Sequence, residues 1–187
     1  MELELVKKFL EKDGAENAPT INGMPTKFFE PFIIQGLRAD FVEPGRVVCS
    51  MKVPPRLLNS GNSMHGGAIA SLVDLAGSAA IFSVGAPSSG VSVEINVSYL
   101  DAAYAGTLCS THFWILPRTE LKQTTSPPVL IILFVIGVVY EEIEIEAKAL
   151  RVGKAVAVVS VELRKKETGK VIAQGRHTKY LTVRSKM

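Results

Sequence analysis

Asp74 is a lone carboxylate in the middle of the most apolar helical stretch of the chain, residues 63–85. Leu72 and Val73 precede it, and Leu75 and Ala76 follow it. An ionised side chain is very costly to bury without a partner. A partly buried aspartate with a perturbed pKa is a candidate functional residue on physical grounds alone. The alternative is a carboxylate that serine hydroxyls or backbone N–H groups satisfy locally.

Hydrogen-bond donors stand just before Asp74 in the sequence, at His65, Gly66 and Gly67. The first backbone N–H groups of a helix have no intrahelical partners, and glycines let a ligand carbonyl approach closely. Asn59 can supply a second donor. Donors that converge on a carbonyl oxygen form an oxyanion hole, and a nearby carboxylate can activate water, so the set predicts acyl hydrolysis. For His65, a structural role in the loop and a catalytic role both stay open.

A buried helix must carry these groups, because residues 66–84 are rich in Ala and Leu and too long for a buried strand. Helical spacing places Gly67, Ala70, Ser71 and Ser78 on the same face as Asp74. This stripe is small and polar, whereas the rest of the helix is apolar. We expect the stripe to open onto a ligand or a second subunit.

Strands account for most of the remaining chain. Two short strands are expected around the turn at residues 43–45, and residues 91–100 alternate between apolar and polar side chains, which predicts a strand with one wet face. Three more strands follow at residues 141–152, 154–166 and 170–183, the last two joined by a turn at residues 167–169. The expected architecture is α+β, with an antiparallel sheet wrapped around one long buried helix.

Bulk composition excludes several classes of protein. A chain of 187 residues that is 47% hydrophobic can build one domain with a proper core. The net charge is +3, without the concentrated basic stripe of a nucleic-acid-binding protein. The two cysteines, Cys49 and Cys109, lack the spacing of a metal site or a disulfide framework. We therefore expect no metal site and no nucleic-acid partner.

Four motifs together resemble the small hotdog-fold acyl-CoA thioesterases of the thioesterase superfamily. They are LNSGNSMHGGAIASLVD, GVSVEINVSYL, LRVGKAVA and TGKVIAQGRHTKY. The resemblance covers residues 33–181 apart from residues 107–140. It implies a hotdog fold, an acyl-CoA substrate with fatty or aromatic acyl groups, and no metal or redox cofactor, since coenzyme A is part of the substrate. It also implies a homodimer, commonly paired into a homotetramer, with the active site between two subunits.

The resemblance also implies roles for individual residues. Asp74 is the general base or nucleophile, and Ser92 orients the attacking water. The Gly66 N–H polarises the thioester carbonyl, helped by Asn59 from the neighbouring subunit's side of the interface. Coenzyme A lies along segments equivalent to residues 99–104 and 151–156, with Tyr180 near the end of the last strand. The residues expected to contact it are Tyr99, Arg151, Gly153, Lys154 and Tyr180. Arg151 and Lys154 have the charge to bind phosphate.

Residues 107–140 have no counterpart in the family. This insert of 34 residues holds the only Trp, a Pro-Pro pair and a charge-free run of twelve apolar residues, too short to span a bilayer, for which about 20 are needed. We expect no stable membrane span. Our hypothesis is that the insert derives from an alternative or unspliced transcript read in frame. Because it adjoins a segment expected to contact coenzyme A, it can disable the enzyme.

Two other functions remain open. Hotdog dehydratases act on 3-hydroxyacyl thioesters with a paired His and acid, but here His65 precedes the helix and the acid lies within it, which favours hydrolysis. A non-catalytic acyl-CoA-binding or interaction protein, disabled by the insert, is the alternative from another class.

The two ends of the chain give further expectations. Residues 1–14 are predicted to form a short amphipathic helix that ends at Gly14, within an N-terminal helix and linker of residues 1–32. The hotdog domain is expected at residues 33–182 and a tail at residues 183–187. Ser185, Lys186 and Met187 differ by one conservative step from the peroxisomal signal S-K-L, so a peroxisomal location is expected, with a cytoplasmic one as the alternative.

Overall fold

The computed structural model describes residues 3–4, 7, 20–21, 24–25, 27–109, 113–114, 133–134 and 137–181. Two helices, a 3-10 turn and twelve strands are defined there. They are β1 (Thr20–Ile21), β2 (Met24–Pro25), α2 (Phe29–Ile34), β3 (Arg38–Glu43), β4 (Arg46–Lys52), η1 (Pro55–Leu57), α3 (Gly66–Phe82), β5 (Val91–Tyr99), β6 (Thr107–Cys109), β7 (Phe113–Trp114), β8 (Leu133–Phe134), β9 (Gly137–Val139), β10 (Glu142–Val152), β11 (Val156–Lys165) and β12 (Val171–Tyr180).

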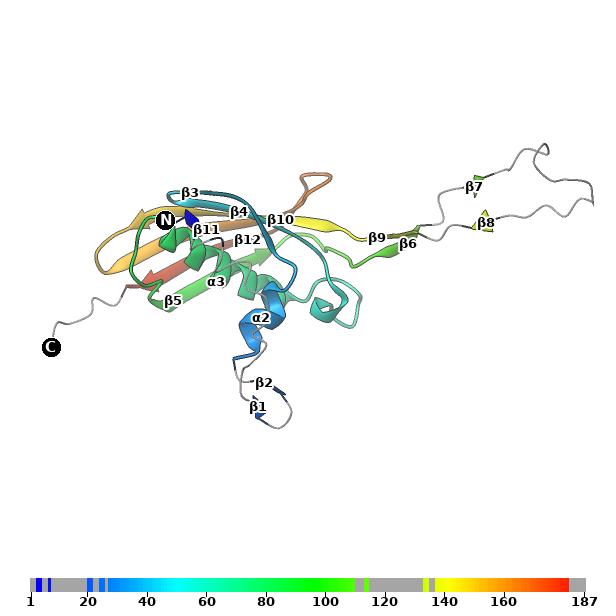
Figure 1. Ribbon diagram of the computed structural model, residues 1–187. Helices are drawn as coiled ribbons and strands as arrows, with labels where there is room; N and C mark the ends of the chain where they lie inside the picture. Colours follow the sequence, from blue (N-terminus) through cyan, green and yellow to red (C-terminus); the bar gives the residue numbers. More distant parts are fainter. Residues whose placement is uncertain are drawn as a thin grey trace, which may run out of the picture.

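Six strands form one antiparallel sheet in the order β3-β4-β10-β11-β12-β5. Helix α3 packs along one face of this sheet, as Figure 1 shows, and the predicted α+β architecture is confirmed. Pairs of residues such as Ile145 and Leu163 face each other across β10 and β11 and are fully buried. Burial of such side chains stabilises the fold by about 1.5–3 kcal/mol each.

The predicted helix at residues 66–84 is confirmed as α3, which ends two residues earlier, at Phe82. Most of its side chains are buried, as its apolar composition requires. Close contact with the sheet depends on Gly175 of β12, where an added Cβ would lie 2.7 Å from a methyl carbon of Val73. A side chain at position 175 would therefore push α3 away from β12.

Two of the expected turns are confirmed. Glu43 pairs with Arg46 across the turn between β3 and β4, and the N–H of Gly169 donates to the carbonyl of Lys165 in the hairpin between β11 and β12. Both turns contain a glycine with a positive φ, +80° at Gly45 and +70° at Gly169. Helix α2 was not predicted, because its short sequence, FEPFII, has too few turns to show a helical period.

The predicted alternation along β5 is confirmed from Glu94 to Tyr99 and is wrong for the residues before them. Thr178 of β12 pairs with Glu94, but the next residue, Lys179, pairs with Ser92, so Val93 is an extra, bulged residue. A bulge moves the following side chains to the opposite face of the strand. Ser92 and Ile95 therefore lie on the same face of the sheet, towards α3. Both faces of β5 are largely exposed in the single subunit, so the expectation of only one wet face is wrong as well.

Within the insert, β6 pairs with β9 and β7 pairs with β8, both antiparallel. The remaining insert residues lie outside the described part of the chain, as do most of the predicted N-terminal helix and the predicted tail at residues 183–187. Among the described residues, no helix has the length and apolar character needed to cross a bilayer. The domain boundaries predicted from the sequence stay a prediction.

Candidate active site

The N-terminus of α3 presents a free backbone donor. His65 is the N-cap residue, and its Nδ1 accepts a hydrogen bond of 2.9 Å from the Gly67 N–H. The N–H of Gly66 has no hydrogen-bond partner among the described residues. This geometry gives His65 the structural role that the sequence left open. It leaves the Gly66 N–H available to a carbonyl oxygen of a ligand.

Asn59 organises the loop that leads into α3. Its Oδ1 accepts from the N–H groups of Gly61 and Ser63 at 2.9 and 3.2 Å, and its Nδ2 donates to the Ser63 Oγ at 2.9 Å. An amide nitrogen carries two hydrogens, so one remains for a ligand. Asn59 can therefore act as a second donor, and its contacts with Gly61 and Ser63 hold its side-chain amide in a fixed position.

Tyr99 closes the same end of α3. Its hydroxyl donates to the carbonyl of Gly66 at 3.1 Å, and a Cβ added at position 66 would lie 3.4 Å from its ring, in ordinary van der Waals contact. The structure thus brings Gly66, His65, Asn59 and Tyr99 to one end of the helix. We call these four residues the glycine half-site.

Asp74 lies two helical turns further along α3, on its open stripe. Gly67 is exposed and Ala70, Ser71 and Asp74 are partly exposed, whereas Ser78, the fifth member of the predicted stripe, is buried. The Asp74 side chain is 39% exposed. Its Oδ1 receives the recorded contacts, and its Oδ2 has no partner among the described residues. One carboxylate oxygen is therefore held by the protein and the other is open to a ligand or to water.

Ser92 reaches this region because of the bulge at Val93. Its Oγ lies 2.9 Å from the Nε2 of His177, whose Nδ1 lies 3.5 Å from the Asp74 Oδ1. Alternation without the bulge would have turned Ser92 away from α3. Asp74, His177 and Ser92 thus lie in a row, in which the Nε2 of His177 is hydrogen-bonded to Ser92, while its buried Nδ1 approaches Asp74 without a hydrogen-bond partner among the described residues.

His177 and Lys179 were missed in the sequence analysis. Both are buried on β12, and the Lys179 Nζ lies 3.1 Å from the Asp74 Oδ1. Burial lowers the pKa of His177 to about 4, with Lys179 acting in the same direction and Asp74 opposing it, so this imidazole is neutral at pH 7. A signal was available: Ala173, Gly175, His177 and Lys179 alternate along the strand that faces the helix. We call Asp74, Ser92, His177 and Lys179 the acid half-site.

The two half-sites are separate within one subunit. Gly66 and Asp74 are eight residues apart on one straight helix, a rise of about 12 Å. A thioester carbonyl that accepts a hydrogen bond from the Gly66 N–H therefore cannot reach the Asp74 carboxylate of the same chain.

The residues expected to contact coenzyme A are also divided between the two ends of the sheet. Arg151, Gly153 and Lys154 are exposed around the hairpin between β10 and β11, and Tyr180 pairs with Val156 beside that hairpin. Tyr99 lies at the far end of β5, in the glycine half-site. The structure therefore brings four of these five residues together and leaves Tyr99 apart from them.

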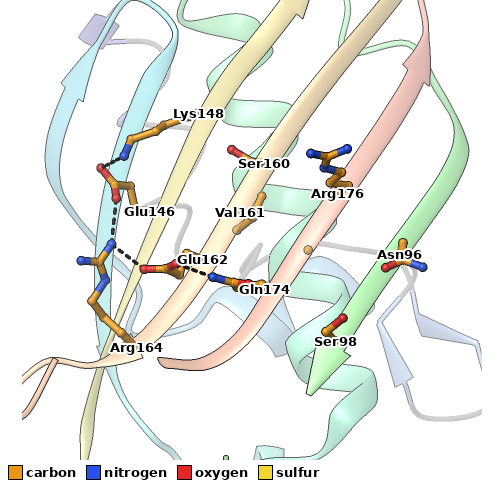
Figure 2. A pocket seen from close by; sticks show the side chains of 11 residues that line it. Asn96, Ser98, Glu146, Lys148, Ser160, Val161, Glu162, Arg164, Gln174 and Arg176 are labelled. Carbon is orange, nitrogen blue, oxygen red and sulfur yellow. Dashed lines mark hydrogen bonds and ion pairs between the residues drawn. The ribbon is translucent and has the colours of Figure 1, made fainter. Parts of the chain in front are cut away.

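A polar hollow of about 520 Å³ lies on the other face of the sheet, away from α3 (Figure 2). Glu146 lies in it, with Arg46 and Lys148 on its Oε1 at 2.7 and 3.0 Å and Arg164 on its Oε2 at 2.7 Å. Burial alone would raise the pKa of Glu146, but the hydrogen bonds from Lys148 and Arg46 outweigh it and lower this pKa to about 2. Both oxygens have cationic partners, so this carboxylate is occupied by the protein itself. Among the described residues, no cluster of three or more His, Cys, Asp or Glu side chains could hold a metal ion.

Comparisons with known proteins agree with this arrangement. A sequence profile of the thioesterase superfamily matches residues 61–113, which include α3 and β5. Human acyl-coenzyme A thioesterase 13 is 35% identical over 138 residues, which cover 74% of each chain. The crystal structure of zebrafish thioesterase superfamily member 2 is 29% identical with a TM-score of 0.67, covering 97% of this chain and 99% of the other. The crystal structure of the mouse protein of that name is 27% identical with a TM-score of 0.64. It covers 97% of this chain and 98% of the mouse chain. The fold and these relatives show that the chain belongs to the thioesterase superfamily.

Proposed function

We propose that the protein hydrolyses acyl-CoA thioesters to the free acid and coenzyme A. The observation that carries the proposal is the open Oδ2 of Asp74, on a carboxylate whose other oxygen is held beside Ser92 and His177. Its relative at 35% identity is named an acyl-coenzyme A thioesterase, and this name agrees with the chemistry of the site.

In the proposed mechanism, Asp74 acts as the general base that takes a proton from water as the water attacks the thioester carbon, and the coenzyme A thiolate that leaves takes up this proton. In the alternative, Asp74 is the nucleophile itself, expels the thiolate and forms an anhydride that water then hydrolyses. The Gly66 N–H donates to the thioester oxygen as negative charge develops on it, and Asn59 supplies a second donor. Ser92 orients the attacking water. Neutral His177 holds the Ser92 hydroxyl through its Nε2. The role of His65 is to cap α3 and to leave the Gly66 N–H free.

A homodimer completes this site, because the Gly66 and Asp74 of one chain are too far apart to act on one thioester. The second edge of β5 has no partner strand among the described residues, and Val91 and Val93 on it are 61% and 66% exposed. A long apolar edge strand is a liability for a lone subunit. Pairing β5 with β5 of a second copy would cover this edge around a two-fold axis. Such an axis brings the glycine half-site of one subunit towards the acid half-site of the other.

Coenzyme A would be bound as part of the substrate. Arg151 and Lys154 on the hairpin between β10 and β11 have the charge for its phosphates, the backbone at Gly153 lets them approach closely, and Tyr180 offers an exposed ring. Tyr99 would contact the substrate from the glycine half-site. No metal ion or redox cofactor is needed for this reaction.

Three further expectations belong to the same proposal. Two dimers would pair into a homotetramer, the reaction would serve lipid metabolism, and the tripeptide at residues 185–187 would direct the protein to the peroxisome. These terminal residues lie outside the described part of the chain. A fusion of residues 182–187 to a fluorescent protein would test the location directly, with a cytoplasmic signal as the contrary result.

The test of function is thiol release from a panel of fatty and aromatic acyl-CoA substrates. It compares the full chain with a chain that lacks residues 107–140. Turnover by either chain that Asp74→Asn abolishes supports the proposal. The second candidate is a non-catalytic acyl-CoA-binding protein. It is favoured by the position of β6, the first strand of the insert, because β6 begins a few residues after Tyr99, a residue expected to contact the substrate. Binding without turnover by both chains would favour it and contradict hydrolysis.

A further inference from the structure

The acid half-site contains a buried cation that the proposed mechanism does not use. Lys179 is 4% exposed. Lysine is almost never buried to this degree unless it is paired, because desolvation of an ammonium group is costly. Its Nζ lies 2.6 Å from the Ser78 Oγ and 3.1 Å from the Asp74 Oδ1. Residues 74 and 78 are one turn apart on α3, so a single ammonium group bridges two positions on the same helix face.

All recorded contacts of the Asp74 carboxylate are made with the same oxygen. The Ser78 hydroxyl at 3.4 Å, the Lys179 ammonium at 3.1 Å and the His177 Nδ1 at 3.5 Å all meet Oδ1. Oδ2 has no partner among the described residues. A carboxylate with one fixed oxygen has a defined rotation about its terminal bond. The contacts at Oδ1 therefore also set the direction of Oδ2, the oxygen that is open to water.

The charges around Asp74 make Lys179 the main electrostatic partner of this carboxylate. Helix α3 carries no other charged residue. From β12, His177 is the second titratable group, and it is neutral at pH 7. On β5, Glu94 pairs with Thr178 and therefore lies on the face away from α3. An ammonium group 3.1 Å from a carboxylate oxygen makes a charge-assisted contact that fixes this oxygen in place.

We propose that Lys179 is a positioning residue of the active site, which holds the Asp74 carboxylate by its Oδ1 and so directs Oδ2 towards the attacking water. The inference rests on the proposed function and deepens it. Lys179 does not touch the substrate in this account. A purely structural lysine would tie β12 to α3, and its loss would lower stability without lowering the kcat of the folded enzyme.

The experiment compares three variants of Lys179 with one control. Lys179→Met removes the charge, Lys179→Gln keeps hydrogen bonding without the charge, and Lys179→Arg keeps the charge. Lys148→Met makes the same change on the opposite face of the sheet, where the lysine pairs with Glu146. Each variant is measured for kcat and KM across pH, and thermal unfolding is recorded beside the kinetics.

We expect kcat to fall about 10- to 100-fold in the Met and Gln variants, with KM little changed, because the general base is misplaced relative to the attacking water. Lys179→Arg should recover most of the rate, and Lys148→Met should match the parent. A folded Lys179→Gln protein with the parent kcat would overturn the proposal.

A second readout does not depend on turnover. The orientation of the Asp74 carboxylate is compared in crystal structures of the parent and of the Gln variant. We expect the carboxylate to turn when the ammonium group is removed, and an unmoved carboxylate would contradict the inference. If the parent protein hydrolyses no acyl-CoA, the proposed function fails, while this comparison still decides the role of Lys179.

Discussion

The two faces of the six-stranded sheet each hold a carboxylate beside cations, but the two carboxylates differ in what is left open. On the face away from α3, both oxygens of Glu146 have cationic partners at 3.0 Å or less. On the face that carries α3, the recorded contacts of Asp74 all fall on Oδ1. A carboxylate with both oxygens paired holds structure together, whereas one with a free oxygen can accept a proton from water. The number of partners on each oxygen separates these roles better than charge or burial does.

The largest expected effect follows from Asp74→Asn, which keeps the shape of the side chain and removes the base. We expect kcat to fall by about 100-fold or more, since general-base catalysis contributes at least that much. The change also leaves the ammonium of Lys179 without its anion, so circular dichroism should confirm that the variant is folded. The double variant with Lys179→Met removes that unpaired charge and is the matched control. A folded variant with the parent kcat would contradict the role given to Asp74.

An intermediate effect is expected from Glu146→Gln, the matching change on the other face. It leaves three cations around a neutral amide, so we expect the free energy of unfolding to fall by about 2–3 kcal/mol. Because Glu146 faces away from α3, kcat should stay within twofold of the parent, a margin of about 0.4 kcal/mol. Urea unfolding and the thiol-release assay measure the two quantities. A loss of activity comparable to that of Asp74→Asn would show that the outer face takes part in catalysis.

The smallest effect is on the pH dependence of stability. His177 on one face and Glu146 on the other change the free energy of unfolding over different pH ranges. Burial lowers the pKa of His177 to about 4 from an ordinary value of 6.5. Between these values the unfolded chain takes up a proton that the native protein does not, so the free energy of unfolding falls as pH falls. For Glu146, whose pKa is about 2 in the fold against 4.5, the stabilisation is present above pH 4.5 and is lost from there down to about pH 2.

Urea unfolding at a series of pH values checks these windows. In His177→Asn, we expect the slope between pH 6.5 and 4 to become smaller and the slope below pH 4.5 to remain. In Glu146→Gln the reverse is expected. If the slope between pH 6.5 and 4 were the same in His177→Asn as in the parent, the neutral state assigned to His177 would be wrong.

Much of this arrangement could be predicted from the sequence. The apolar helix around Asp74, the glycine pair at its start and the alternating strands all follow from local patterns. The bulge at Val93 could not be predicted, because its register depends on which residues of β12 face β5, a long-range pairing. That single extra residue turns Ser92 towards His177 and Asp74.

His177 and Lys179 show a different limit. Their alternation with Gly175 on β12 was readable, but a polar residue on a buried face becomes meaningful only when its partner across the core is known. His65 shows a third case: local sequence left two roles open, and the contact with the Gly67 N–H supplies one of them. Pairings near in sequence were thus predictable, while those between α3, β5 and β12 required the fold.

The central claim is that one active site combines Gly66 of one subunit with Asp74 of the other. Gly66→Pro removes the N–H at a helix position that favours proline, and His65 before it is already extended, as a residue before proline requires. Gly66→Ala, which keeps the N–H, is its control. Gly66→Pro and Asp74→Asn proteins, each inactive alone, are unfolded and refolded together.

Half of the dimers formed by random mixing are mixed, and each has one intact site of two, so the account predicts recovery of about a quarter of the parent activity. A refolded mixture that contains mixed dimers but is no more active than the two separate variants would contradict the shared site.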